Sequence, residues 1–174
     1  DKITSFLNQL SFSNAEFKID ISQAEPQLSG IDQVIFQIRT FKGADLAPIS
    51  KVASGGELSR ISLAIRVASA ENTNIPVMIF DEVDVGIGGG VAEIVGKLLK
   101  QLGSFYQVFS ITHLAQVASK ADHHFKVYKD EKEESVISKI DLLSDEDRIQ
   151  ETARMLGGID ITATTLEHAK EMLH

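Results

Sequence analysis

Four apolar residues followed by two acids, VMIFDE at residues 77–82, restrict the fold of this chain more than any other stretch. A short, continuous apolar run after Pro76 is typical of a β-strand that is buried on both faces. Such strands belong to α/β folds, whose open sheets bind ligands at the carboxyl ends of their strands. The sequence therefore predicts an α/β fold with a ligand site beside Asp81 and Glu82.

The two carboxylates suit phosphoryl chemistry. One carboxylate can hold Mg²⁺, usually through water, and we assign this metal-binding role to Asp81. Its neighbour Glu82 is then predicted to orient the attacking water as general base. The alternative interpretation is a strand that ends in two solvated acids.

Residues 54–57, SGGE, are the second informative stretch. Ser54 and Glu57 match a capping box, a common way to begin a helix. The capping interpretation does not explain Gly55 and Gly56, because each glycine costs roughly 1 kcal/mol in a helix relative to alanine. Glycines at a helix N-terminus let an anion approach the backbone N–H groups and the positive end of the dipole. The stretch therefore indicates phosphate binding.

Histidines occur at two informative positions. His113 follows the predicted strand 108–111 and so stands at a second strand's carboxyl edge, although a lone histidine is more often a surface or helix-start residue. His123 and His124 are adjacent, and adjacent residues in a strand point to opposite faces. We interpret this pair as structural.

Glycine patterns exclude two nucleotide-binding motifs. The run 86–90, GIGGG, has Val91 where a dinucleotide loop needs its last glycine, and it follows two acids. A P-loop requires GxxxxGK[ST], yet the only Gly-Lys pair, Gly96-Lys97, is followed by Leu98. The sequence contains no P-loop.

Hydrophobic periodicity predicts the elements along the chain. The expected helices cover residues 1–10, 57–71, 91–102, 145–156 and 162–173, with a short one from His113. The expected strands lie around residues 17–21, 34–38, 77–80, 108–111, 124–128 and 136–142, the last two forming a hairpin with its tip at 129–134. A turn region at 26–30 and a loop at 43–56 separate the early elements.

This order predicts one domain over residues 1–174, with a mostly parallel sheet, flanking helices and a preceding antiparallel portion. In the helix 57–71, we expect the buried stripe to consist of Leu58, Ile61, Ile65 and Ala68.

Composition limits the possible partners. Lys and Arg total 17 against 25 Asp and Glu, a net charge of −8, whereas a duplex-DNA binder usually presents a basic face. If the protein works on DNA, we expect most of the contact to lie elsewhere.

The sequence has no cysteine, which excludes disulfides and thiolate metal sites and fits a reducing cytoplasm. No signal-peptide pattern opens the chain, and no apolar run approaches the ~20 residues of a membrane span. The first residue is not Met, so we expect a piece of something longer.

Taken in order, SGGE, Asp81-Glu82 and His113 resemble the signature motif, Walker B motif and switch histidine of ABC-type ATPases. Four longer stretches are similar to the RecN family, the SMC-like bacterial DNA-repair ATPases. They are KVASGGELSR at 51–60, FDEVDVGIGG at 80–89, ITHLAQVA at 111–118 and ARMLGG at 153–158. The resemblance covers essentially the whole chain as the C-terminal lobe of a head with a partial P-loop NTPase fold, with residues 1–10 as the returning end of a coiled coil.

The resemblance implies a role for each motif. Two heads of the family sandwich ATP, and the signature of one faces the P-loop of the other. By resemblance, residues 54–57 (Ser54, Gly55, Gly56 and Glu57) would form the cofactor-binding set, in which Ser54 and Gly56 touch the γ-phosphate of ATP held by the partner. Asp81 would serve Mg²⁺, Glu82 would be the base and His113 would sense the γ-phosphate. Gly88 stands where many ABC-type ATPases have the D-loop aspartate. RecN relatives share this departure from the wider pattern.

The implied partners are an N-terminal lobe of the same protein that carries the P-loop, a second head in an ATP-dependent homodimer, and DNA through the full-length protein. The implied location is the bacterial cytoplasm, near the nucleoid. The isolated chain is expected to be inactive. Two alternatives stay open: a head lobe of another SMC-like ATPase, and a non-catalytic dimerisation domain of the same fold. The glycines after Glu82 favour RecN over the first, and Glu82 with His113 argues against the second.

Overall fold

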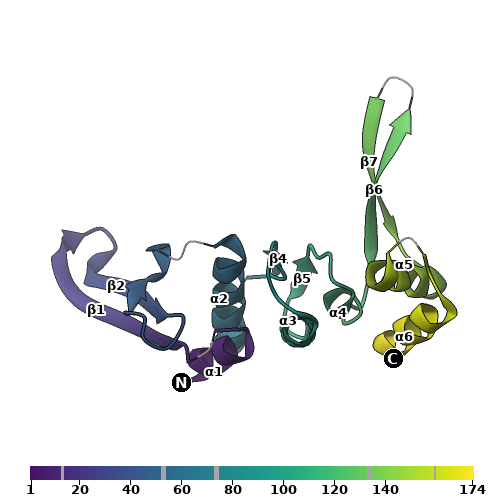
Figure 1. Cartoon of the computed structure of the whole chain (residues 1–174). Helices are drawn as coiled ribbons and strands as arrows, with labels where there is room; N and C mark the ends of the chain where they lie inside the picture. The colour runs from purple at the N-terminus through teal and green to yellow at the C-terminus, as the bar shows by residue number, and fades with distance from the viewer. Residues whose placement is uncertain (13, 52–53, 73–74, 133–134, 159) are drawn as a thin grey trace. The chain divides into compact units, whose positions relative to one another are not determined.

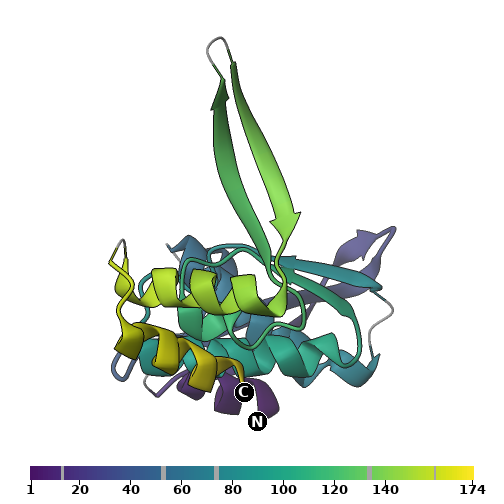
Figure 2. The same ribbon diagram turned by 90° about the vertical axis from the view of Figure 1, so that its right-hand side faces the viewer.

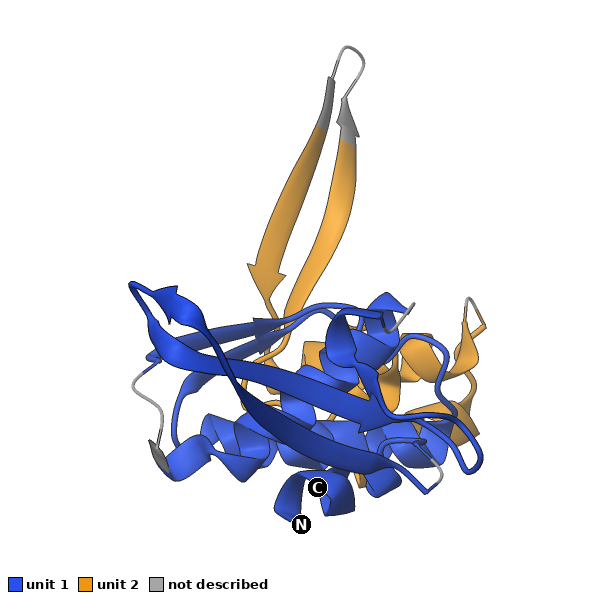
Figure 3. Cartoon of the chain, turned by 90° about the vertical axis from the view of Figure 1, so that its left-hand side faces the viewer, with its two compact units in different colours: residues 1–111 blue, residues 112–174 orange. Residues whose placement is uncertain are grey.

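The computed structural model describes residues 1–12, 14–51, 54–72, 75–132, 135–158 and 160–174. These residues form two compact units, residues 1–111 and 112–174, which Figure 3 distinguishes by colour. A single domain over residues 1–174 stays a prediction. Within the described residues, every helix is too short or too polar to cross a membrane.

The first unit begins with helix α1 (Lys2–Gln9) and an antiparallel sheet. The sheet joins β1 (Glu16–Gln27), β2 (Gly30–Arg39) and β3 (Ala47–Pro48), which is followed by the short helix η1 (Ile49–Lys51). Phe17, Ile19 and Ile21 of β1 face apolar residues of β2 across the ladder, which confirms both predicted strands. The turn is tighter than we expected, because β1 continues through Pro26 after a shift in register.

A parallel strand pair with its crossover helix follows, as Figure 1 shows. Its elements are α2 (Gly55–Ala68), η2 (Ala70–Asn72), β4 (Val77–Phe80), α3 (Gly89–Gly103) and β5 (Gln107–Ser110). The pairing continues past β5, because the backbone N–H of Ile111 donates to the carbonyl of Phe80 at 2.9 Å. The carboxyl ends of β4 and β5 therefore meet at one edge.

Strand β4 was wrongly predicted to be buried on both faces. Met78 and Phe80 are 7% and 6% exposed, but Val77 and Ile79 on the other face are 40% and 70% exposed. The expectation of a mostly parallel sheet is also wrong for this chain, since two of the three sheets formed by the described residues are antiparallel. Apolar composition alone cannot tell a strand covered by its own chain from one left uncovered.

Helix α2 buries a different stripe from the predicted one. Ile61 is buried as expected, whereas Leu58 is exposed and Ile65 and Ala68 are half-buried. The face turned inward carries Arg60, Leu63, Ala64 and Val67, at spacings of three, four and seven residues. A charged residue thus occupies a core position that periodicity reserves for an apolar one.

The second unit contains α4 (Ala115–Ala118), β6 (Phe125–Lys132), β7 (Ser135–Leu142), α5 (Asp145–Gly157) and α6 (Ala163–Leu173). The predicted hairpin is confirmed as a long two-stranded ribbon (Figure 2), and residues 133–134 of its predicted tip lie outside the described residues. Glu151 of α5 pairs with Lys126 of β6 and with Arg154, each at 2.6 Å. The hydrogen bonds from Arg154 are the main reason why the pKa of Glu151 falls to about 2.

Candidate functional site

The N-terminus of α2 has the geometry of a capped helix. Ser54 is extended, and its Oγ accepts the backbone N–H of Glu57 at 3.4 Å. Gly55 and Gly56 form the first turn, and Gly56 is buried. The cap that the sequence predicts is therefore present. Residues 52–53, part of the KVASGGELSR stretch at 51–60, lie outside the described residues.

Asp81 and Glu82 are exposed and open a tight turn directly after β4, which we call the acid turn (residues 81–85). The backbone N–H of Val85 donates to the carbonyl of Glu82 at 3.2 Å, and the N–H of Glu82 donates to Oδ1 of Asp81 at 2.9 Å. Glu82 has a φ of 58°, in the left-handed region that non-glycine residues rarely adopt. The next residues, Val83 and Asp84, are buried and anchor the turn.

Helix α2 holds the acid turn at both ends. Ser59 Oγ donates to the carbonyl of Asp81 at 2.7 Å, and Arg60 Nη1 donates to the carbonyl of Val85 at 2.9 Å. Two neighbouring residues of one helix thus fix the first and the last carbonyl of the turn.

The two glycines let the helix end approach the turn. A Cβ added to Gly56 would lie 3.1 Å from the carbonyl oxygens of both Glu82 and Val85, and one added to Gly55 would overlap the Glu82 carboxylate. The structure therefore brings the predicted residues 54–57 together with Glu82 and with its neighbour Asp81 in one unit.

This arrangement offers backbone N–H groups and the positive end of a helix dipole beside two carboxylates. The first suits a phosphate and the second suits Mg²⁺, which is held in proteins by one or two carboxylates together with waters and phosphate oxygens. The described residues contain no cluster of three or more metal-binding side chains. Asp81 fits the role of a single protein ligand to a metal that a phosphate also holds.

His113 is exposed and lies in the second unit, before α4. The Thr112 hydroxyl accepts the N–H of Leu114 at 3.1 Å and shapes the turn around it. Its place beside the two acids stays a prediction. Burial, with help from the nearby charge of Arg148, lowers the pKa of His124, as suits a neutral, structural histidine.

Sequence reasoning missed Ser59 and Arg60 as parts of the site. Arg60 is 6% exposed, and burial lowers the pKa of its guanidinium while the charge of Glu57 opposes that shift. The signal was present, because Arg60 shares a helical face with Leu63, Ala64 and Val67. An arginine on the same helical face as an apolar stripe indicates a charged side chain that is buried against the rest of the fold.

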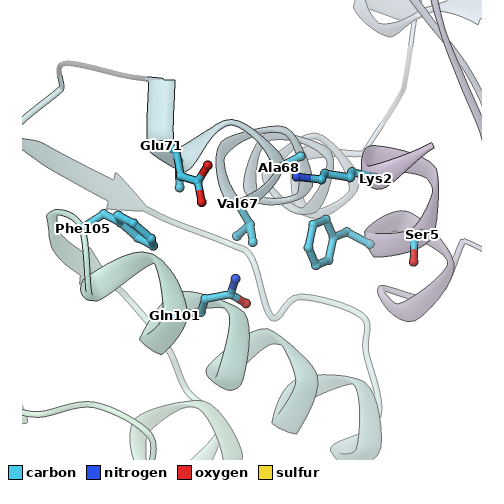
Figure 4. Close-up of a pocket in the computed structure, with 9 residues that line it drawn as sticks. Lys2, Ser5, Val67, Ala68, Glu71, Gln101 and Phe105 are labelled. Atoms are coloured by element: carbon cyan, nitrogen blue, oxygen red, sulfur yellow. The ribbon is translucent and has the colours of Figure 1, made fainter.

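A separate cavity of about 290 Å³ lies in the same unit, between α1, the end of α2 and α3 (Figure 4). The apolar Val67 and Phe105 and the polar or charged Lys2, Glu71 and Gln101 are among the residues that line it. Its lining includes none of residues 54–57 or 81–85, so it is distinct from the candidate site.

The chain is similar to known proteins along most of its length. The model of the RecF/RecN/SMC N-terminal domain matches residues 3–136. The DNA repair protein RecN of Vibrio cholerae is 48% identical over 173 residues, which cover 98% of this chain and 31% of that protein. The chain thus spans about a third of the length of this relative.

Two solved structures have the same fold. The Smc head domain of Pyrococcus furiosus, with an extended coiled coil and bound to the C-terminal domain of ScpA, has a TM-score of 0.61 at 21% identity, over 89% of this chain and 37% of that one. The second structure comes from work on the structural biochemistry of ATP-driven dimerization and DNA stimulated activation of SMC ATPases. It has a TM-score of 0.53 at 20% identity, over 91% of each chain. The fold is that of SMC heads, and the chain belongs to the RecF/RecN/SMC N-terminal domain family.

Proposed function

We propose that this chain is the C-terminal lobe of an SMC-like ATPase head in a bacterial DNA-repair protein of the RecN type. The observation that carries the proposal is the packing of the α2 N-terminus on the acid turn, through the two bonds from Ser59 and Arg60. The high identity to RecN of Vibrio cholerae supports the repair role.

In this function each motif has one task. Ser54 and the N–H groups of Gly55 and Gly56 contact the γ-phosphate of ATP bound to a partner head. Glu82 takes the proton of the attacking water, and His113 senses the γ-phosphate. Asp81 serves Mg²⁺, which when bound neutralises phosphate charge.

The first partner is an N-terminal lobe that carries the P-loop missing from this sequence. Ile79 and Phe109 pair across the β4–β5 ladder and leave an apolar face exposed, at 70% and 42%. A two-stranded sheet is marginal by itself, and β5 has no second neighbour among the described strands. Further strands and helices from the N-terminal lobe would cover that face.

The other partners are a second head, joined through ATP, and DNA. The description of the SMC ATPase structure names ATP-driven dimerization, which supports the first. The net charge of −8 favours DNA contacts outside this chain. The proposed location is the bacterial cytoplasm, near the nucleoid.

An ATPase assay with three samples tests the function: this chain alone, the chain mixed with a P-loop lobe from the same protein, and that mixture with Glu82→Gln. We expect turnover in the second sample only. Calorimetry of the chain alone should show no ATP binding tighter than about 1 μM, because nothing in its sequence cradles the α- and β-phosphates. Turnover by the chain alone, or an inactive mixture, would contradict the proposal.

A further inference from the structure

The inference concerns Arg60, a charged side chain in a core position. It is 6% exposed, and its Nε is buried without a hydrogen-bond partner in the described part of the chain. Burying a charge that is only partly satisfied destabilises a protein, and an apolar side chain of similar volume often does better. Fold stability therefore does not explain an arginine at this position.

The contacts of Arg60 point to a different role. Its Nη1 donates to the carbonyl of Val85, the last residue of the acid turn. The carbon at the centre of the guanidinium lies 5.7 Å from the centre of the Phe12 ring, within the range of a cation–π contact. Phe12 is 3% exposed, and its own N–H donates to the carbonyl of Leu7 in α1. One planar side chain thus connects α1, α2 and the acid turn.

The acid turn needs such a connection. Glu82 lies inside it, with its backbone in the left-handed region, and a strained residue keeps its conformation only where surrounding contacts impose it. Ser59 holds the carbonyl of Asp81 before Glu82, and Arg60 holds the carbonyl of Val85 after it. Without Arg60, the second end of the turn loses its side-chain hydrogen bond from α2.

We propose that Arg60 is a positioning residue, which holds the acid turn against α2 and Phe12 and so keeps Glu82 in place for hydrolysis. The inference rests on the proposed function, in which Glu82 is the base. A purely structural Arg60 would change stability when replaced; a positioning Arg60 changes turnover instead.

The experiment uses the full-length protein and measures kcat, KM for ATP and melting temperature. Arg60→Met keeps much of the volume and removes the charge and the donors. We expect kcat to fall about 10-fold or more, because small misplacements of catalytic groups are costly, while KM stays within about 2-fold. Melting temperature should stay within a few degrees of the wild type or rise. Arg66→Met, at the other end of α2 and only half-buried, is the matched control and should behave as wild type.

Arg60→Lys covers the case in which Arg60→Met does not fold. Lysine keeps the charge but lacks the planar fork that reaches Val85 and stacks on Phe12 at once, so kcat should fall about 3-fold or more. The inference would be overturned, and the proposed function left standing, if the folded Arg60 variant had the kcat of the wild type. The same would follow if Arg66→Met lost as much kcat as the Arg60 variant. A Glu82→Gln protein as fast as wild type would instead remove the proposed function, and this inference with it.

Discussion

At the scale of single residues, Glu82 combines an exposed carboxylate with a φ of 58°. Left-handed backbone costs a non-glycine residue roughly 1–2 kcal/mol, and such residues cluster at active sites. The hydrogen bonds around the acid turn offset this cost. We infer that the conformation serves to aim the side chain.

Glu82→Gln tests whether the carboxylate held in this position is the general base. Glutamine keeps the shape of the side chain and loses the base, so hydrolysis in the full-length protein should fall by ~10²-fold or more. ATP binding should persist, and ATP-dependent association of the heads should last longer. Turnover is read from phosphate release and association from light scattering. Turnover close to wild type would mean that Glu82 is not the base.

Ser54 has two separable roles, as helix cap and as phosphate contact. Ser54→Ala removes the cap bond to Glu57 and should cost about 1 kcal/mol of stability. Ser54→Arg should in addition block ATP-driven association of heads, because its bulk meets the partner's nucleotide, while each head's own ATP affinity stays nearly unchanged.

Light scattering with and without ATP, together with a melting curve, distinguishes these roles. If Ser54→Arg is less stable than wild type yet associates normally with ATP, then Ser54 is a helix cap only.

At the scale of elements, the sequence predicts most helices and strands because their periodicity is local. The antiparallel pair β1–β2 and the hairpin β6–β7 come from alternating side chains, and α2 begins where its capping residues stand. What it could not predict depends on contacts between distant segments. The spacing of α2 places Arg60 on the inward face, but it does not show that the guanidinium meets Phe12 and the carbonyl of Val85.

Glu151 joins α5 to β6 through its pairs with Arg154 and Lys126. Its pKa falls from 4.5 to about 2 on folding, which corresponds to at most about 3–4 kcal/mol. The two cations are partly exposed to water, so we expect about 1–2 kcal/mol. Because the folded pKa is lowered, this stability is present above pH 4.5 and is lost as the pH falls towards 2.

Glu151→Gln should therefore reduce the free energy of unfolding at pH 7 and have little effect at pH 2.5. Urea unfolding at both pH values measures the difference. Glu167→Gln, an exposed acid on α6, serves as control and should have little effect at either pH. A loss of equal size at both pH values would show that the charge of Glu151 does not stabilise the fold.

At the scale of the whole molecule, the exposed face of β4 and β5 predicts a missing partner. Ile79→Ser should change the stability of this chain by no more than about 0.5 kcal/mol, because Ile79 is 70% exposed. If the N-terminal lobe buries Ile79, the same change should weaken association of the lobes about 10-fold or more.

Calorimetric titration of the two lobes measures that affinity. Leu28→Ser is the control, since Leu28 is fully exposed between β1 and β2 and should not affect binding. Equal affinity of the wild type and Ile79→Ser would place the lobe contact elsewhere.

The crowding around Gly56 has an evolutionary consequence. Every change of one base that replaces glycine by another amino acid introduces a side chain with a Cβ. At Gly56 that carbon would press on two backbone carbonyls, whereas at Gly88 and Gly90 it would meet no atom within 4 Å. On packing grounds, positions 88 and 90 can therefore accept other residues, while at position 56 every residue other than glycine forces the helix or the acid turn to shift by a few tenths of an ångström.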